Sequence, residues 1–236
     1  MDGFSLPVGL ITNVASVALG GLSGVALSKH IDDKLGDKLT LIFGVCALAN
    51  GITSVNKATA LSAIILAVIV GALIGETIHL DRLVTGFFKG VLNGLPTKKK
   101  DFDMAMYVTI AVIFCASGFG IYGVFMEGMS GDSSFLLSKS ILDFFTAAIF
   151  AKTLGIAVCL IAVPQAVILV ALLFLGHFIG PYITPDQMQN FIACGGVLAI
   201  ASGFTIAKIK QFSMVNLLPA LVLVIPTTWL YNAIFS

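Results

Sequence analysis

Eight long apolar segments follow one another along this chain and leave little room for a water-exposed surface. They cover residues 7–27, 39–55, 58–78, 104–126, 136–151, 154–179, 188–207 and 214–234. A helix that crosses a bilayer needs about 20 mostly apolar residues. The pattern therefore predicts an all-α polytopic membrane protein of seven to eight transmembrane helices, with residues 1–236 in a single transmembrane domain.

Composition supports a membrane protein and argues against other classes. Hydrophobic residues make up 58% of the chain, charged residues make up 11%, and the mean hydropathy is +1.05. A soluble domain carries about 25% charged residues. The net charge is only +1, without the clustered basic residues of a nucleic-acid-binding protein. We therefore expect the lipid bilayer as a partner, and no nucleic acid.

Catalytic and metal-binding signatures are missing from the sequence. The cysteines lie in apolar segments without C-x-x-C spacing, which is typical of small buried residues; they are Cys46, Cys115, Cys159 and Cys194. The histidines are dispersed, and no nucleophile elbow, HExxH or P-loop motif is present. We therefore expect no enzyme activity, no metal site and no cofactor. Because the N-terminus lacks a basic signal-peptide region, the first segment should remain as a transmembrane helix.

The segment 136–151 is short, and the placement of lysines indicates whether it crosses the membrane. Positively charged loops tend to stay cytoplasmic. Lysines gather after the first, third and seventh segments, and these loops share one side only if residues 136–151 cross. This predicts eight spans with both termini outside. A re-entrant segment remains the alternative.

A polar loop over residues 79–103 follows the third apolar segment. Its first part, residues 79–95, is amphipathic and precedes the run Lys98, Lys99 and Lys100. An amphipathic helix beside basic residues is typical of a membrane-surface helix. The alternative is a plain basic cytoplasmic loop.

A weak internal repeat appears when the chain is shifted by 152 residues, so that Ala49-Asn-Gly-Ile-Thr53 aligns with Ala201-Ser-Gly-Phe-Thr205. The first helices of the two halves are an odd number of spans apart, so the repeats would be inverted, a common transporter plan. We expect repeat 1 in residues 1–78, inserted helices in 104–153 and repeat 2 in 154–236. General similarity among transmembrane helices is the alternative.

Glycines recur at helical spacing in several segments, where they allow helix backbones to approach closely. The candidates for helix packing are Gly20, Gly21, Gly24, Gly44, Gly51, Gly71, Gly75, Gly196 and Gly203. A hinge or a narrow path opened by these glycines is the functional alternative.

Lys139 and Asp143 stand four residues apart inside an apolar segment. An ionisable side chain at the centre of a membrane helix costs about 2.5–3.5 kcal/mol. The i, i+4 spacing places both on one helix face, where they neutralise each other. Such residues mark a functional site in membrane proteins, although a structural ion pair has the same spacing.

Other polar side chains interrupt the apolar segments. Asn13 and Gln165 match under the 152-residue shift, and Pro164 removes a backbone hydrogen bond beside Gln165. We predict that a solute or ion pathway is formed by Asn13, Ser138, Lys139, Ser140, Asp143 and Gln165. The alternative is that each polar group only fixes the packing of a neighbouring helix.

Two carboxylates precede the segment that holds the ion pair. Glu127 and Asp132 lie near the same membrane face and could form a vestibule that attracts cations. The alternative for Asp132, Ser133 or Ser134 is to cap the following helix through a short oxygen side chain.

The stretch Phe125-Met-Glu-Gly-Met-Ser-Gly-Asp-Ser-Ser-Phe-Leu-Leu-Ser-Lys-Ser-Ile-Leu-Asp-Phe144 resembles the YqgA/YdfK-like bacterial membrane proteins, grouped as domain of unknown function 554. Gly71-Ala-Leu-Ile-Gly-Glu76, Phe114-Cys-Ala-Ser-Gly118, Leu154-Gly-Ile-Ala-Val158 and Asn216-Leu-Leu-Pro-Ala-Leu221 are similar to the same family. The resemblance covers nearly the whole chain. It implies a multi-pass protein of the bacterial cytoplasmic membrane and no particular substrate.

Two functions fit these observations. The first is a transporter or channel for a small solute or ion, with Asp143 as the group that binds a proton or cation. The second is a structural or signalling membrane protein in which the ion pair only stabilises packing. A homodimer is compatible with both.

Overall fold

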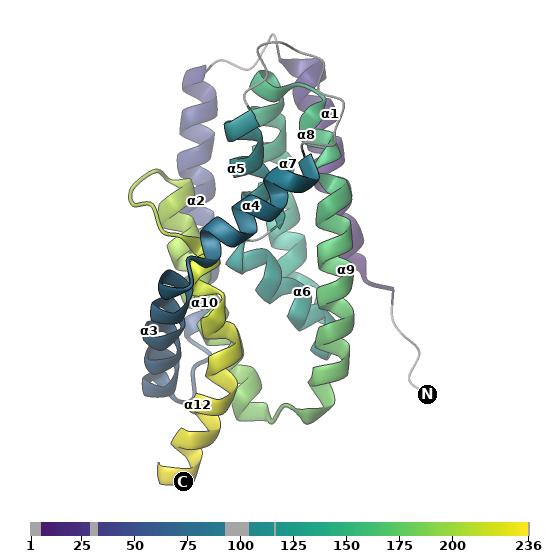
Figure 1. The fold of residues 1–236 in the computed structure, drawn as a ribbon. Coiled ribbons are helices and arrows are strands. Elements are labelled where there is room, and N and C mark those ends of the chain that lie inside the picture. The colour runs from purple at the N-terminus through teal and green to yellow at the C-terminus, as the bar shows by residue number, and fades with distance from the viewer. Residues whose placement is uncertain (1–5, 29–32, 93–103, 116, 236) are drawn as a thin grey trace. The chain divides into compact units, whose positions relative to one another are not determined.

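The computed structural model describes residues 6–28, 33–92, 104–115 and 117–235, and within these ranges every regular element is a helix (Figure 1). The contacts divide the chain into two compact units. Unit 1 comprises Met1–Lys38, Phe88–Ala116 and Gly123–Pro181, and unit 2 comprises Leu39–Phe87, Ser117–Tyr122 and Tyr182–Ser236.

Unit 1 contains the pairing of α1 with α7. Its helices are α1 (Val8–Leu27), α5 (Met104–Cys115), most of α6 (Gly118–Ser130), α7 (Ser134–Leu154), α8 (Ala157–Leu160) and α9 (Ala162–Ile179). The buried residues of α1 are mostly small or polar and recur every three to four positions. A Cβ atom on Gly20 or Gly24 would overlap the backbone of α7. Small residues therefore bring α1 and α7 side by side (Figure 1).

Backbone chemistry explains where the helices of unit 1 break. Gly155 ends α7 with a φ of 64°, a left-handed conformation that glycine adopts without steric cost. Pro164 has no N–H to donate to Leu160, and Leu160 is the last residue of α8. The predicted segment 154–179 is therefore the pair α8 and α9. The segment 104–126 contains α5 and the first part of α6.

Unit 2 contains antiparallel helix pairs that meet at glycines. Its helices are the part of α2 (Asp33–Val55) that begins at Leu39, α3 (Leu61–Thr77), the first part of α4 (Leu80–Leu92), α10 (Pro185–Ile206), α11 (Met214–Leu217) and α12 (Pro219–Phe235). The 3₁₀ turn η1 (Gly180–Tyr182) ends at Tyr182, the first residue of the last segment of unit 2. Gly44 contacts Gly203, and Gly51 contacts Gly196. The order of these contacts is reversed between the helices, so α2 and α10 run antiparallel.

The second helix pair in unit 2, α3 with α11 and α12, also meets at glycines and runs antiparallel. Gly71 of α3 contacts Ala220 of α12, and Gly75 contacts Asn216 of α11. A side chain at either glycine would meet backbone atoms of the partner helix. The glycines selected from the sequence for helix packing therefore lie where two helices approach closely.

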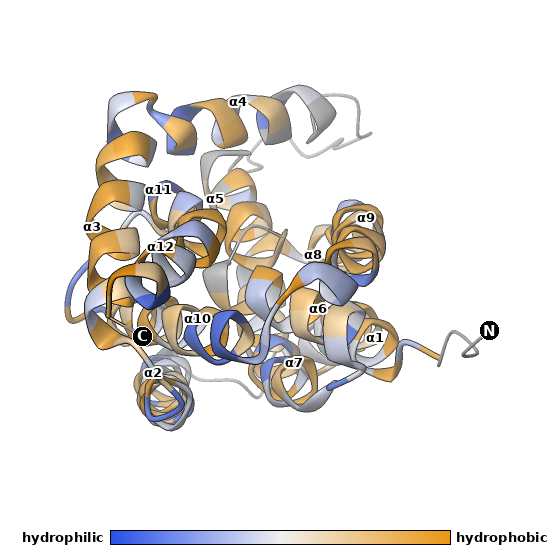
Figure 2. Ribbon diagram, turned by 90° about the horizontal axis from the view of Figure 1, so that it is seen from below, coloured by the Kyte–Doolittle hydropathy of each residue, from blue (hydrophilic) through white to orange (hydrophobic). Residues whose placement is uncertain are grey.

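α4 leaves α3 at an angle of 60°. The bend is made at His79, whose φ is 52°, and hydropathy alternates between apolar and polar along α4 (Figure 2). The amphipathic segment is thus helical, while its place at the membrane surface stays a prediction. Lys98, Lys99 and Lys100 lie outside the described residues.

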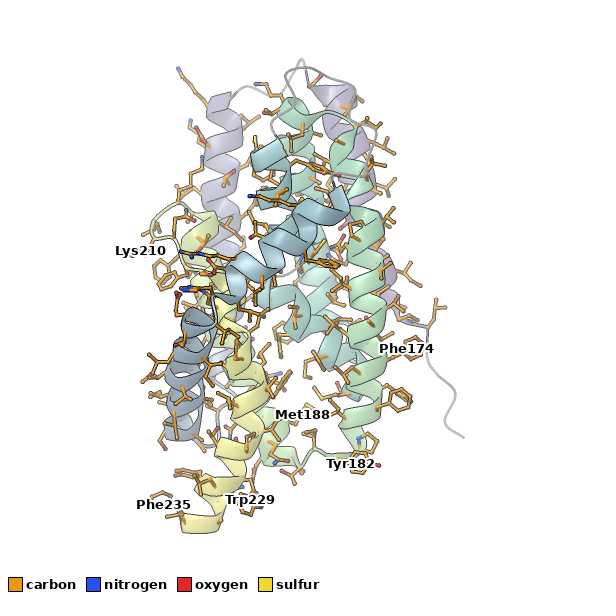
Figure 3. The ribbon with its side chains drawn as sticks, in the orientation of Figure 1. Phe174, Tyr182, Met188, Lys210, Trp229 and Phe235 are labelled. Carbon is orange, nitrogen blue, oxygen red and sulfur yellow. The ribbon has the colours of Figure 1, made fainter. Side chains whose placement is uncertain are left out.

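In the described part of the chain, seven helical segments are long and apolar enough to cross a membrane, or up to eight if the bent α3–α4 pair is one span. Three of the seven run over consecutive helices, namely α5–α6, α8–α9 and α11–α12. This confirms the predicted all-α polytopic class. α7 is one unbroken helix of 21 residues, so the chain does not turn back within residues 136–151. Large apolar side chains such as Phe174 and Trp229 project outward (Figure 3), as expected for surfaces in contact with lipid.

Candidate functional site

Four polar side chains from three helices of unit 1 meet in one hydrogen-bonded chain, here called the polar chain: Lys139, Asp143, Asn13 and Gln165. The ammonium of Lys139 pairs with Oδ2 of Asp143. Nδ2 of Asn13 donates to the same carboxylate oxygen at 2.8 Å, and Nε2 of Gln165 donates to Oδ1 of Asn13 at 3.0 Å. The structure therefore brings together the charged pair and both amides that the sequence selected.

Helix geometry explains why these residues converge. Lys139 and Asp143 are one turn apart on the buried face of α7, in line with Leu136 and Ala147. Asn13 stands on the buried face of α1, and Gln165 lies in the first turn of α9, directly after Pro164. The tight packing of α1 on α7 brings the Asn13 amide within hydrogen-bond distance of the Asp143 carboxylate.

The network fixes the orientation of each amide. Asn13 must present its NH₂ group to Asp143, because a carboxylate only accepts hydrogen bonds. Its Oδ1 atom then faces Gln165, which must present its own NH₂ group in return. Oε1 of Gln165 is left buried, and no protein group donates a hydrogen bond to it. A buried acceptor of this kind costs about 1–3 kcal/mol, so its persistence calls for an explanation.

The whole polar chain is removed from solvent. Asn13 and Gln165 are 0% exposed, Lys139 is 3% exposed and Asp143 is 7% exposed. An isolated buried charge is very unfavourable, but the pair as a unit is neutral. The amide of Gln165 also interacts with the carboxylate of Asp143, so this carboxylate is the point to which the other groups are directed.

The two serines predicted with the pair do not join the polar chain. Ser138 donates to the carbonyl of Ser134, and Ser140 donates to the carbonyl of Leu136. Ser140 and Ser16 instead line a shallow surface hollow of about 340 Å³ between α1 and α7.

Glu127 lies at the start of α1, away from solvent. Its two carboxylate oxygens accept from the N–H groups of Gly9 at 2.6 Å and Leu10 at 2.9 Å, and one also accepts from Oγ of Ser133 at 2.7 Å. The first N–H groups of a helix lack partners within the helix and favour a negative charge. This geometry is that of a helix cap supplied by α6, and the vestibule remains an untested prediction.

Asp132 also bonds a helix start. Its Oδ1 atom accepts from the N–H of Ser134 at 2.9 Å, at the first residue of α7. This is the capping alternative that the sequence left open.

Replacing Glu127 by alanine is expected to destabilise the protein by about 2 kcal/mol or more, because hydrogen bonds to a charged group are each worth about 1.5–3 kcal/mol. The measurement is thermal unfolding of the detergent-solubilised protein. Glu76→Ala is the matched control, since Glu76 is exposed at the end of α3. Equal melting temperatures for the two variants would contradict a capping role for Glu127.

Three amides in unit 2 were not selected from the sequence. Oδ1 of Asn190 accepts from the N–H groups of Thr59 and Ala60, just before α3. Oδ1 of Asn216 accepts from the N–H of Asp81 at the bend between α3 and α4. Gln187 closes a capping box with Thr184 at the start of α10. The sequence could have identified two of them, because Asn190 and Asn216 are amides in apolar segments. Both accept hydrogen bonds from backbone N–H groups near helix starts.

Among the described residues, no three His, Cys, Asp or Glu side chains are grouped together. The polar chain offers one carboxylate and side-chain carbonyl oxygens. Oxygen ligands of this kind suit hard cations or protons and do not favour soft metals.

The family model with the description "Protein of unknown function (DUF554)" matches residues 8–229. The chain is 42% identical over 233 residues to "Uncharacterized protein YqgA" of Escherichia coli (strain K12), covering 97% of this chain and 99% of the relative. It is 27% identical over 224 residues to "Uncharacterized membrane protein YdfK" of Bacillus subtilis (strain 168), covering 91% and 93%. No solved structure matches.

Proposed function

This chain belongs to the DUF554 family, and from that premise we propose that it is a transporter or channel that carries a small solute or ion past the polar chain. The supporting observation is the convergence of an ion pair and two amides from α1, α7 and α9 in an otherwise apolar unit. Ionisable groups buried in membrane helices are characteristic of ion and substrate pathways.

Helix pairing supports an inverted-repeat architecture as part of this proposal. The shift of 152 residues relates α1 to α9, α2 to α10, and α3 to α11 and α12. Each helix shares a compact unit with its counterpart, and the glycine contacts make the second and third pairs antiparallel. Asn13 bonds Gln165, its own counterpart. A two-fold axis brings equivalent positions together in this way, and inverted repeats place the site near the membrane midplane.

We place the protein in the bacterial cytoplasmic membrane with eight crossings and both termini outside. The two relatives described above come from bacteria. The lysine-rich loops favour the orientation with both termini outside. We also propose that the protein forms a homodimer.

Replacing Asp143 by asparagine is expected to reduce transport at least about tenfold, because the change removes the charge and keeps the side-chain volume. Purified protein would be reconstituted into liposomes, and uptake of radioactive sodium, rubidium and chloride would be measured. Asp186→Asn is the matched control, since Asp186 is exposed at the start of α10. Uptake equal to that of empty liposomes for every probe, or full activity of Asp143→Asn, would overturn the proposal.

A non-transporting structural or signalling role is the second candidate, and one observation favours it. Lys139 and Asp143 lie in the close contact between α1 and α7 and are bonded within the protein. Intramembrane polar contacts average about 0.6 kcal/mol in measured cases, so a purely structural pair would contribute little. The paired leucine variants discussed below separate the two roles.

A further inference from the structure

The unpartnered Oε1 atom of Gln165 points to a ligand that the polar chain lacks. Gln165 is 0% exposed, and its amide orientation follows from the hydrogen bonds of Asn13. A buried carbonyl oxygen without a donor can be satisfied by a cation or by a hydrogen-bond donor. It lies in the same cluster as the Asp143 carboxylate, with which the Gln165 amide interacts.

The charge of the cluster restricts the ligand to a single positive charge. Asp143 is the only carboxylate in the polar chain, and it is already neutralised by Lys139. A cation that enters while Lys139 stays protonated would leave a net positive charge in a buried, apolar site, which is strongly disfavoured. Neutrality is kept if the ammonium of Lys139 loses one proton as the cation binds.

The other ionisable groups around the pair do not offer an alternative source of this proton. α1 brings no ionisable side chain to its contact with α7. α5 carries the phenol of Tyr107 and the thiol of Cys115, α8 carries the thiol of Cys159, and the only ionisable side chain on α9 is His177, in its last turn. α6, which packs against Leu136 of α7, carries the buried phenol of Tyr122 and the carboxylate of Glu127. Both oxygens of that carboxylate accept hydrogen bonds. Deprotonation of a buried phenol or thiol would create a new buried anion, whereas deprotonation of Lys139 removes a charge.

We propose that the polar chain is a cation–proton exchange site, in which a small monovalent cation binds to the Asp143 carboxylate and the Gln165 carbonyl and displaces one proton from Lys139. One N–H bond of the ammonium breaks and the proton leaves to water, while the cation takes its place beside the carboxylate. The site is neutral before and after the step. This inference rests on the proposed transport function and specifies its substrate class.

The test is proton release from purified full-length protein in weakly buffered detergent solution, followed with a pH-sensitive dye. Sodium, lithium or potassium chloride is added, with choline chloride as the ionic-strength control. The expected release approaches about one proton per protein at saturation, as charge balance requires. Lys139→Arg should abolish it, because a guanidinium keeps the ion pair but does not lose its proton.

Two further variants keep the test decisive. Lys152→Arg makes the same substitution in the last turn of α7 and should release protons like the unaltered protein. Gln165→Leu should raise the sodium concentration for half-maximal release about tenfold, and this shift decides the question if Lys139→Arg does not fold. An unaltered protein that releases no proton, or a Lys139→Arg variant that still does, overturns the exchange. If liposome uptake nevertheless depends on Asp143, the proposed transport function survives that result.

Discussion

Replacing Lys139 alone by leucine is expected to destabilise the protein by about 3–5 kcal/mol, because it leaves the Asp143 carboxylate buried without its counter-charge. The neutral amides of Asn13 and Gln165 would still interact with that carboxylate, but neutral donors do not replace the charge of an ammonium. Thermal unfolding in detergent measures the loss. Lys210→Leu is the control, since this lysine is exposed and projects outward (Figure 3).

The double variant Lys139→Leu with Asp143→Leu is expected to recover most of that loss, because an apolar pair can replace a buried ion pair at little cost or with a gain of about 1–4 kcal/mol. Recovery should be incomplete, since the amide of Asn13 then loses its acceptor. Recovered stability with no transport would assign the pair to function. Failed folding of the double variant would favour the structural role, and unchanged transport would remove the pair from the pathway.

The helices were predictable because apolar length is a strong signal in a membrane protein. Each of the eight segments corresponds to one helix or to two consecutive helices, and the resemblance to the family is confirmed. The boundaries between consecutive helices within one apolar segment were harder to predict from the sequence. α5 ends at Cys115 and α6 begins at Gly118, where the small residues Ser117, Gly118 and Gly120 are equally compatible with close packing in a straight helix.

At the start of α2 the helix is longer than the apolar segment in the sequence. The apolar segment begins at Leu39, whereas α2 begins at Asp33. Hydropathy marks the part of a helix that contacts lipid, but a helix continues into polar residues as long as their backbone groups can be bonded. The lysine and aspartate residues in the first turns of α2 therefore do not prevent helix formation there.

For the site, the sequence indicated which residues are unusual but not how they are connected. The spacing of Lys139 and Asp143 predicts their pairing, because it is local to one helix. The distance between Asn13 and Asp143 depends on how α1 packs on α7, which no local pattern contains. Glu127 illustrates the same limit, since its partners Gly9 and Leu10 are more than 100 positions away in the chain.

Replacing Gly24 by leucine is expected to destabilise unit 1 by about 3 kcal/mol or more, at or above the upper end of overpacking effects. A Cβ atom at this position would overlap the backbone of Ala148 in α7, and at Gly20 it would overlap the backbone of Phe144. Flexible side chains can move aside, but a helix backbone cannot yield without separating α1 from α7. That separation would also pull Asn13 away from Asp143, so we expect uptake in liposomes to fall together with stability.

Gly86→Leu is the matched control for this prediction. Gly86 lies in α4 with open space around it, and leucine is a better helix former than glycine by nearly 1 kcal/mol. This control should therefore melt at or above the temperature of the unaltered protein, while Gly24→Leu melts well below it or fails to yield a monodisperse protein. A Gly24→Leu variant that melts like the control would mean that the close approach of α1 and α7 does not hold the polar chain together. The alignment of Asn13 with Asp143 would then need another cause.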